Sequence, residues 1–411
     1  MQDRIAVIGG GIVGVSTALH LQRRGQKVVL IDPVEPGDPA QTSFGNAGIL
    51  AREGVSPVAT PAVLFDIPKI LTGRGPIYVN WKELPGNLRW IAQLILSGRH
   101  KNRAAFSAAM NGLVYDTVEQ HLALAKGTSA ERYIRQGLFT FLYQDETHRA
   151  SDALSRKFQK DNGVLFDLAS RETLASRDPH LSARYQAGVD FEGHGWITNP
   201  SAYVNALFQH FLDIGGSFEN AKVAAISENN LVLEDGRNLT ASQHVISAGA
   251  WSAEILKSLN VKMPLRAERG YHLRFQNPSM KPPHPYLIMD NRFGFTPMDT
   301  ELRAAGTTDL SSSDAPPKKL AHKNLRRFVH MIYPELKFDD VQEWTGSRPT
   351  LSDGLPAIGR LEKAPRIICA FGSQHMGLTM GPKLGAMVAD MVDGQHTNVD
   401  LTPYSPDRFA R

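Results

Sequence analysis

The sequence predicts an α/β fold of two domains, in which one domain is assembled from separated segments of the chain and the other is inserted between them. Three observations support this prediction. The first 32 residues follow a strand–helix–strand pattern, the middle is rich in short strand patterns, and the end returns to a strand followed by a helix. A chain of 411 residues also exceeds what one small hydrophobic core requires.

The amino-terminal unit has the clearest pattern. Residues 4–8 (RIAVI) form an apolar run that ends in glycines, as a buried parallel strand does. From 12 to 24 apolar residues recur at helical spacing, and Gly25 stands where a helix ends. A second strand is expected at 27–31 (KVVLI), which completes a strand–helix–strand unit.

The turn inside this unit carries the pattern GxGxxG. It is formed by Gly9, Gly11 and Gly14, with Ile12 and Val13 between the last two. In dinucleotide-binding folds these glycines permit a tight turn, approach of a pyrophosphate to the backbone, and close helix–strand packing. Asp32 closes the second strand, where a carboxylate accepts hydrogen bonds from an adenosine ribose and repels a 2′-phosphate. We therefore expect a Rossmann-like unit that binds a dinucleotide other than NADP.

Further segments have helix or strand patterns. We expect helices over most of 87–126, at 200–212 with Asn199 or Ser201 as N-cap, and at 382–392. We expect strands at 138–143, 188–191, 271–275, 294–297, 302–306 and 366–371, and a small β-meander made of 222–226, 230–234 and 244–247. The amphipathic stretch 88–97 either lies against a membrane or, as we favour, packs on the body of the protein.

The composition argues against several classes of protein. The net charge is only +4, and basic residues form short pairs such as Lys318-Lys319 and not the stripe that nucleic acid requires. The 14 histidines and the single Cys369 show no metal-ligand spacing, and one cysteine forms no intrachain disulfide. No run approaches the roughly 20 apolar residues of a spanning helix, and no signal peptide is evident. We expect a cytoplasmic protein, with peripheral contact at the inner face of the cytoplasmic membrane left open. The sequence does not indicate an oligomeric state.

Six segments carry a family resemblance. They are GGGIVG at 9–14 with Asp32, TSFGNAG at 42–48, SAGAW at 247–251, ERGYH at 268–272, GSRPTLSDGLPAIG at 346–359 and GSQHMGLT at 372–379. Over nearly its whole length the chain resembles the D-amino-acid oxidase family of flavoproteins, and within it the bacterial FAD-dependent D-amino acid dehydrogenases. The resemblance implies FAD as cofactor. It also implies an FAD-binding domain made of 1–80, 197–265 and 340–411, with an inserted α+β substrate-binding domain, built on an antiparallel sheet, made of 81–196 and 266–339.

Several of these segments are predicted to hold FAD. The loop 42–48 offers hydroxyls, an amide and exposed N–H groups to flavin and pyrophosphate. Bare backbone at 248–249 is expected near the cofactor, while Trp251 either supports that turn or lies in the core. The segment 372–379 precedes the last helix, so its N–H groups are expected to face the flavin O2 region, where negative charge builds. Outside the first unit the predicted cofactor residues are Thr42, Ser43, Asn46, Ala47, Gly48, Val223, Ala248, Gly249, Trp251, Gly372, Met376, Gly377, Leu378 and Thr379.

Arg348 is the main candidate for substrate binding. In the resembled family the arginine of the matching GSRP motif binds the substrate carboxylate, and a guanidinium fork suits that group. The alternative is a structural ion pair. His375 is predicted to contact the carboxylate or amine, unless its role is structural. On the strand that holds Tyr271 and His272, we expect one side chain to cap the pocket and the other to face away. We take Arg348, His375 and Tyr271 as the candidate catalytic residues.

The resemblance implies oxidation of a small D-amino or cyclic imino acid, such as D-proline or hydroxy-D-proline, by hydride transfer from Cα to flavin N5. The segment GSQHMGLT is similar to the branch that acts on D-hydroxyproline, although Ser373 stands where that branch commonly has histidine. The electrons are expected to pass to a quinone or another acceptor. Three alternatives stay open: a sarcosine- or glycine-type oxidase that uses oxygen, an NAD-dependent dehydrogenase, and a flavin-binding electron-transfer subunit without its own substrate.

Overall fold

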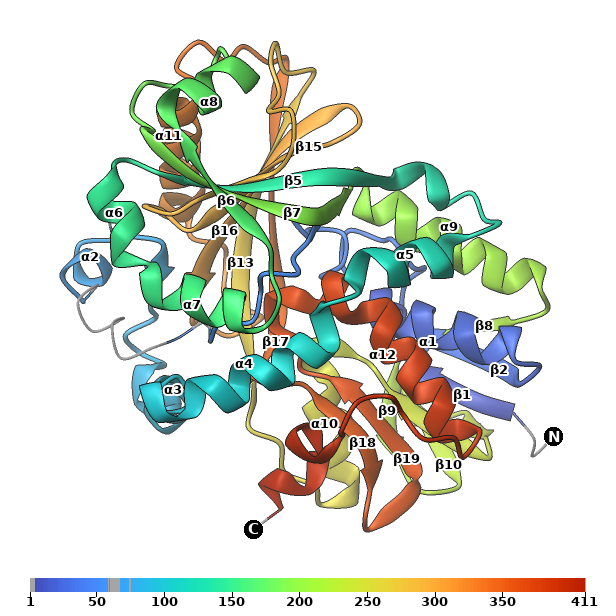
Figure 1. The fold of residues 1–411 in the computed structure, drawn as a ribbon. Helices are drawn as coiled ribbons and strands as arrows, with labels where there is room; N and C mark the ends of the chain where they lie inside the picture. The colour runs from blue at the N-terminus through green and yellow to red at the C-terminus, as the bar shows by residue number, and fades with distance from the viewer. Residues whose placement is uncertain (1–3, 58, 60–66, 74, 411) are drawn as a thin grey trace.

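The computed structural model describes residues 4–57, 59, 67–73 and 75–410 and has the α/β architecture that the sequence predicts (Figure 1). Within these residues the strands form a mostly parallel sheet, a large mixed sheet and a small antiparallel meander. The parallel sheet occupies the lower part of Figure 1 and the mixed sheet the upper part, with helices around both.

The parallel sheet has the amino-terminal unit at its centre. Its order in the described residues is β18-β19-β12-β1-β2-β8, and all neighbours are parallel except β18 and β19. The strands are β1 (Arg4–Ile8), β2 (Lys27–Asp32), β8 (Ser217–Asn220), β12 (Gln243–Ile246), β18 (Ala357–Leu361) and β19 (Ala364–Phe371). β1 is buried from Ile5 to Ile8, as expected for an apolar strand with both faces covered. The strands predicted at 4–8, 27–31 and 366–371 are confirmed.

One predicted strand pairs differently from our expectation. We placed 244–247 in the meander, but β12 lies between β1 and β19, with Val245 opposite Val7 and Ile368. The meander consists of β9 (Val223–Ile226), β10 (Asn230–Leu233) and β11 (Asn238–Thr240). A short apolar strand pattern shows that a segment is buried but not which strand it pairs with, so the prediction of a sequential neighbour was wrong.

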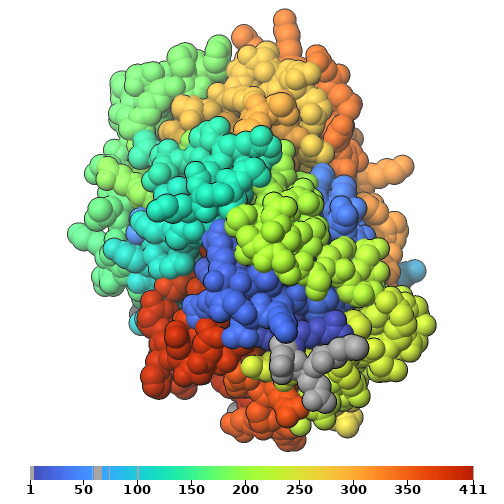
Figure 2. Space-filling model, turned by 90° about the vertical axis from the view of Figure 1, so that its right-hand side faces the viewer, coloured from blue at the N-terminus to red at the C-terminus, as the bar shows by residue number. Residues whose placement is uncertain are grey.

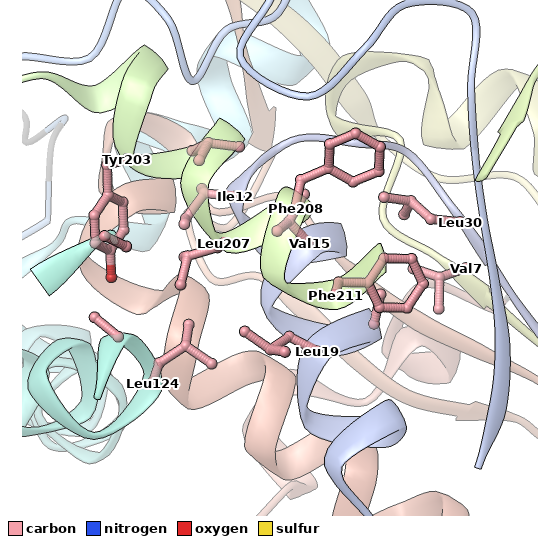
Figure 3. Packing of buried hydrophobic residues seen from close by; sticks show 14 of the residues in the cluster. Val7, Ile12, Val15, Leu19, Leu30, Leu124, Tyr203, Leu207, Phe208 and Phe211 are labelled. Carbon is pink, nitrogen blue, oxygen red and sulfur yellow. The ribbon is translucent and has the colours of Figure 1, made fainter. Parts of the chain in front are cut away.

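In the part of the chain that the structure describes, one face of the parallel sheet is covered by helices α1 (Ile12–Arg23), α9 (Pro200–Asp213) and α12 (Gly377–Val392). Side chains of α1 and α9 share one core cluster, in which Val15 and Leu19 lie near Leu207 and Phe211 (Figure 3). Figure 2 shows this side of the molecule, with the blue amino-terminal residues between yellow-green and red segments. The helix predicted at 200–212 is confirmed, and Asn199 caps it by accepting a hydrogen bond from the Ala202 amide at 3.1 Å.

Helix α12 begins at Gly377, five residues before the predicted start at Pro382. Proline lacks the N–H that would bond to the carbonyl of Leu378, four residues earlier. His121 replaces that bond, because its Nε2 lies 2.9 Å from the Leu378 oxygen while its Nδ1 lies 2.8 Å from the Tyr203 hydroxyl. A carbonyl only accepts, so Nε2 carries the proton and the Tyr203 hydroxyl donates to Nδ1. A partner distant in sequence thus lets the helix continue through proline.

The mixed sheet supplies the rest of the frame. Its order in the described part of the chain is β17-β13-β16-β15-β14-β5-β7-β3, with β4 beside β16 and β6 beside β7. The strands are β3 (Ile49–Leu50), β4 (Ile77–Tyr78), β5 (Ile134–Tyr143), β6 (Phe166–Ser170), β7 (Ala187–Ile197), β13 (Leu265–Gln276), β14 (Tyr286–Ile288), β15 (Phe293–Pro297), β16 (Glu301–Asp309) and β17 (Asp340–Leu351). The strands predicted at 138–143, 188–191, 271–275, 294–297 and 302–306 are confirmed.

Helices connect and cover this sheet. They are α2 (Ile67–Leu71), α3 (Leu84–Ser97), α4 (His100–Val114), α5 (Thr117–Ala125), α6 (Glu146–Ser151), α7 (Ala153–Asp161), α8 (Arg171–Arg177) and α11 (Lys319–Ile332), while α10 (Ser252–Leu256) packs beside β9. The helical prediction for 87–126 is confirmed. Trp90 of α3 is buried, whereas Leu88 and Leu96 are exposed. Among the described residues, no helix combines the length and apolar character needed to cross a membrane.

The domain boundaries stay predictions. The parallel sheet draws its strands from the ranges predicted to bind FAD. The short strands β3 and β4 and the long strand β17 also fall in those ranges, yet they pair within the mixed sheet. The chain therefore crosses between the two sheets at several places, which brings their edges together.

Buried histidines should make the fold sensitive to acid. Burial lowers the pKa of His20, His121, His244 and His284 to about 4. Between pH 6.5 and about 4 the unfolded chain therefore binds more protons than the folded one, so the free energy of unfolding falls as the pH falls. His121→Gln keeps a donor and an acceptor without this titration. We expect its stability to fall less steeply between pH 6 and 5, by up to about 1.4 kcal/mol per pH unit, in a pH series of denaturant unfolding. Parallel slopes for the variant and the wild type would contradict this account.

Candidate functional site

A cavity of about 1520 Å³ lies where the two sheets meet. Its wall combines the carboxyl ends of β1 and β2, the loop after β2, the residues before α12, and parts of β13, β16 and β17. Ligands of open α/β sheets bind at the carboxyl ends of parallel strands. All the predicted cofactor and substrate residues line this cavity except Gly14 and Gly48.

The start of α1 forms one end of the cavity. Gly9 has φ +108°, and a Cβ there would lie 2.5 Å from the Ser247 carbonyl oxygen. Gly11 faces open space, since its Cβ would meet only the Ser43 hydroxyl at 3.3 Å. Gly14 lies under the turn, where a Cβ would come within 1.7 Å of the Gly9 oxygen. The backbone amides at this helix start thus face a space that suits a pyrophosphate, while Gly14 keeps the helix against β1.

Asp32 is held at the end of β2 by the same turn. Its carboxylate accepts hydrogen bonds from the Gly10 amide at 2.6 Å and from the Val34 amide at 3.0 Å. Burial raises its pKa above the ordinary value, although these bonds oppose the shift. The carboxylate lines the cavity and keeps lone pairs for a ribose diol.

The loop 42–48 closes over the helix start. The Ser43 hydroxyl accepts from the Ile12 amide at 3.0 Å, and the Thr42 hydroxyl donates to the Ser347 carbonyl at 2.7 Å. Asn46 accepts from the Gly48 amide, so Gly48 supports the turn from outside the cavity. Asn46 and Ala47 line the cavity with Thr42 and Ser43.

The second flank of the cavity comes from the segments around β9 and β12. Val223, Ala248, Gly249 and Trp251 all line it. Trp251 is 49% exposed, so of its two predicted roles the core position is wrong and support of the turn remains.

The segment before α12 forms the floor. Gly372 and Gln374 both have positive φ, +89° and +51°, which turns the chain sharply before the helix starts at Gly377. Thr379 ties this helix to β3, because its hydroxyl lies 3.3 Å from both the Ile49 carbonyl and the Ala51 amide. The Ser373 hydroxyl is buried and has no partner among the described residues. The floor thus offers the backbone amides at the start of α12 and one unpaired hydroxyl. These donors suit the polar, electron-rich edge of a ring.

Arg348 is held at a β-bulge. The register between β13 and β16 shifts between Arg269, which faces Asp309, and Tyr271, which faces Gly306, so that Gly270 alone lies opposite Thr307 and Thr308. The guanidinium donates from Nη1 to the Thr307 carbonyl at 2.9 Å and from Nη2 to the Gly306 carbonyl at 3.3 Å. Thr307 has φ +58°, which is strained for a β-branched residue. A Cβ on Gly270 would lie 2.4 Å from Nη2. The bulge and the glycine together create the space for this side chain.

Glu268 forms an ion pair with the Arg348 guanidinium. Its Oε1 lies 3.2 Å from Arg348 Nη1 and accepts from the Thr308 hydroxyl at 2.9 Å, and its Oε2 accepts from the Thr350 hydroxyl at 3.1 Å. The predicted alternative of an ion pair is therefore present. This ion pair does not use all the donors of the guanidinium. Its three hydrogen bonds to described residues leave two of the five N–H donors for a ligand.

His375 and Tyr271 differ in their access to the cavity. His375 is exposed, but to the cavity and not to bulk solvent, and burial together with Arg348 lowers its pKa below 6.5. It is therefore neutral at neutral pH. Tyr271 is 1% exposed, and its hydroxyl donates to Asp309 at 2.7 Å and accepts from the Lys318 amide at 3.0 Å. Its neighbour His272 faces the opposite side of β13 and bonds to the Gly45 carbonyl. A direct contact of Tyr271 with substrate stays a prediction.

Comparisons with known proteins agree with this geometry. Residues 4–391 match the family model described as "FAD dependent oxidoreductase". The chain belongs to this family. It is 32% identical, over 98% of both chains, to a D-amino-acid oxidase of Bradyrhizobium diazoefficiens. Its fold is similar to glycine oxidase from Geobacillus kaustophilus (TM-score 0.74, 20% identity, 98% of both chains) and to L-proline dehydrogenase from P. horikoshii (TM-score 0.76, 19% identity, 100% of this chain and 98% of that one).

The chain is an FAD-dependent oxidoreductase, and the lining of the cavity fits FAD. The open backbone at Gly11, the carboxylate of Asp32 and the helix start at Gly377 fit the pyrophosphate, the adenosine ribose and the flavin in turn. In the described ranges, no three His, Cys, Asp or Glu side chains gather in a way that could hold a metal ion.

Sequence reasoning missed several residues of this oxidoreductase's cavity. Glu268 stood in a recognised motif, but nothing marked it as the partner of Arg348. Glu53 was not singled out and lines the cavity in contact with buried His194. The apolar wall was missed as well; it includes Ile70, Leu84, Ile91, Leu94 and Ile95.

Two glycine substitutions should separate cofactor binding from folding. Gly11→Ala meets only the Ser43 hydroxyl, at 3.3 Å, which needs to shift by a few tenths of an ångström, so we expect an apoprotein of near-wild-type stability that retains little FAD, because the methyl group fills the pyrophosphate space. Gly14→Ala forces a backbone collision and should lower the melting temperature of the apoprotein as well. Flavin absorbance and thermal unfolding measure the two effects. Equal melting temperatures for the two apoproteins would refute the distinction.

Gly270→Ala tests the space that holds Arg348. The new methyl group displaces the guanidinium, whereas Gly270 itself has ordinary backbone angles. We expect full FAD content, near-wild-type stability and a KM for substrate raised about tenfold, since one charge-assisted hydrogen bond is worth about 1.5–3 kcal/mol. Gly86→Ala, at an exposed position of α3 with ordinary backbone angles and open space around it, is the matched control for a glycine-to-alanine change. An unchanged KM in the Gly270 variant would show that the position of Arg348 is not important.

Proposed function

We propose that this enzyme oxidises the C–N bond of a small D-amino or cyclic imino acid, such as D-proline or hydroxy-D-proline, and passes the electrons to a quinone. The observation that carries the proposal is Arg348, a half-buried cation in the cavity with a fixed position and with two N–H donors that no described residue uses. A guanidinium edge of this kind suits a carboxylate.

The carboxylate contact determines how the substrate lies. Arg348 is anchored to two strand carbonyls and to Glu268, so a bound acid group has little freedom to rotate. Bound FAD supplies the hydride acceptor. The protein's own contribution is to fix the substrate Cα relative to the cavity floor and to exclude water, because orientation alone lowers a reaction barrier substantially.

The substrate class is supported by the relative from Bradyrhizobium diazoefficiens that is named D-amino-acid oxidase. The solved structures named glycine oxidase and L-proline dehydrogenase act, by those names, on an amino acid and on a cyclic imino acid. The D configuration and the preference for a ring rest on the sequence resemblance at 372–379.

A quinone acceptor is supported by the apolar wall of the cavity. Ile91, Leu94 and Ile95 of α3 face inward at helical spacing, and Trp81, Leu88 and Leu96 are exposed nearby. An apolar approach of this kind suits a lipophilic ring more than a small polar molecule. Cytoplasmic location with peripheral contact at the membrane is part of the same proposal.

Anaerobic reduction of the enzyme by a panel of substrates tests the proposal. The yellow enzyme is mixed without oxygen with D- and L-forms of proline, hydroxyproline and alanine, with sarcosine and with glycine, and loss of flavin absorbance is followed. Bleaching by D-proline or hydroxy-D-proline supports the proposal, and reoxidation by a soluble quinone faster than by oxygen supports the acceptor. Bleaching by sarcosine or glycine with peroxide release in air favours the oxidase alternative. Bleaching by none of these compounds favours an electron-transfer subunit.

Arg348→Met should weaken substrate capture without loss of FAD. Methionine keeps apolar contacts of the side chain but removes the charge-assisted bonds, so we expect kcat/KM to fall roughly 10- to 150-fold. Arg348→Lys should recover part of the loss, since an ammonium group attracts a carboxylate but does not bind it in a bidentate manner. Arg366→Met, on the exposed side of β19, serves as the control. A normal kcat/KM in Arg348→Met would remove the basis of the proposed function.

A further inference from the structure

The cavity contains a second polar group, Glu53, whose environment indicates a role in proton transfer. Glu53 lies in the loop after β3, and its side chain is 7% exposed and lines the cavity. Its Oε2 lies 2.8 Å from Nε2 of His194 on β7, which is 1% exposed and lies behind it. Among the described residues, the hydrogen bonds of this carboxylate involve Oε2 alone, so Oε1 is the oxygen available to a ligand.

The pair holds one exchangeable proton. Nδ1 of His194 lies 2.9 Å from the Glu192 carbonyl, which only accepts, so Nδ1 carries a hydrogen. Nε2 and Oε2 lie at hydrogen-bond distance and both accept unless one of them is protonated. A single proton therefore lies between them, either on His194 beside an ionised Glu53 or on Glu53 itself. The backbone N–H of Glu53, 3.3 Å from Nε2, makes the weaker competing contact.

The loop of Glu53 is fixed beside the floor of the cavity. The next residue, Gly54, packs so closely on Met376 that a Cβ would lie 2.3 Å from its terminal methyl group. The Glu53 carbonyl accepts from the Gln159 amide group and from the Val55 amide. Glu53 thus lies against the segment that carries His375, and Arg348, Glu268 and Glu53 all act electrostatically on that histidine.

Charged and titratable groups surround Glu53 on several elements. On its own loop, Arg52 faces outward to Glu119 at 3.6 Å and to the Gly193 carbonyl. His194 approaches from β7, His375 from the segment before α12, Glu268 from β13 and Arg348 from β17. His375 is neutral at neutral pH, since its pKa is lowered by burial and by Arg348. An ammonium group that reaches Glu53 therefore meets Oε1 of a carboxyl group whose Oε2 is paired with His194, and this pair with its one proton carries no net charge.

We propose that Glu53, oriented by His194, binds the substrate ammonium group and takes up the proton that it must lose before the C–N bond is oxidised. This inference rests on the proposed function and names the group that prepares the amine. One N–H bond breaks and one O–H bond forms on Glu53. The electron pair left on nitrogen becomes the C=N bond as the Cα hydride leaves to the oxidised flavin. The proton then returns from Glu53 to solvent after the product leaves.

A matched ligand pair tests the binding contact without turnover. 2-Aminoisobutyrate has no hydrogen on Cα and cannot donate hydride, and pivalate replaces its ammonium group with a methyl group of similar size. Dissociation constants come from the change in flavin absorbance on titration. We expect the wild type to prefer 2-aminoisobutyrate and Glu53→Gln to bind it about tenfold more weakly, with pivalate binding unchanged, because one charge-assisted bond is lost.

The pH dependence of anaerobic bleaching tests the proton transfer. At neutral pH, Glu53→Gln should bleach about 100-fold more slowly than the wild type. Its rate should then rise about tenfold per pH unit toward the solution pKa of the substrate ammonium group, because only free amine reacts. Glu53→Asp should recover part of the rate, and His194→Gln, which leaves the carboxylate in place, should give an intermediate loss. Glu119→Gln makes the same chemical change on the other side of Arg52 and should match the wild type.

These measurements separate the two proposals. If Arg348→Met binds pivalate as tightly as the wild type does, the proposed function fails whatever Glu53 does. If Arg348→Met loses both ligands but Glu53→Gln keeps the wild-type preference and pH profile, the role of Glu53 is wrong and the proposed function stands. If Glu53→Gln does not retain FAD, ligand binding and the pH profile are measured on Glu53→Asp and His194→Gln instead. Wild-type ligand preference and a wild-type pH profile in both variants would overturn the proposed role of Glu53.

Discussion

Close backbone contact at the start of α1 is the constraint on which the rest of the molecule depends. Gly14 lies so near the Gly9 carbonyl that no side chain fits between them, and on the opposite side of α1 Gly385 of α12 packs against the backbone of Ser16. These contacts pull two helices against one face of the parallel sheet. They also place two helix starts, at Ile12 and Gly377, on the same cavity, so that the positive ends of both helices face it.

The other end of the cavity depends on irregularity in the mixed sheet. An ordinary antiparallel pair would direct the Gly306 and Thr307 carbonyls into the ladder. The bulge and the positive φ of Thr307 turn both carbonyls toward Arg348 instead. Strain of this kind costs on the order of 1–3 kcal/mol and persists only where neighbouring structure enforces it. Here the long pairing of β13 with β17 on one side and with β16 on the other provides that enforcement.

Local patterns could be read from the sequence, and long-range partners could not. The glycine turn, Asp32 and the helix at 200–212 depend on neighbours within about twenty residues, and they appear where the sequence predicts them. The position of β12 between β1 and β19 depends on strands more than a hundred residues away, so a short apolar run could not reveal it. Glu53 and His194 are separated by 141 positions and match no spacing rule. The early start of α12 was hidden for the same reason, since His121 satisfies the carbonyl that Pro382 leaves free.

The arrangement of charge also bears on which molecules the cavity accepts. Arg348 and Glu268 sum to zero, Glu53 and His194 share one proton and sum to zero, and His375 is neutral at neutral pH. Because an uncompensated charge is costly to transfer from water into a partly buried site, this part of the cavity favours a ligand without net charge. A zwitterionic amino or imino acid meets this condition, and its two charged ends face groups of opposite sign. A carboxylate without an amine brings a net negative charge into the same site, where Arg348 is already paired with Glu268. The electrostatics of the site therefore disfavour acids that lack an amine.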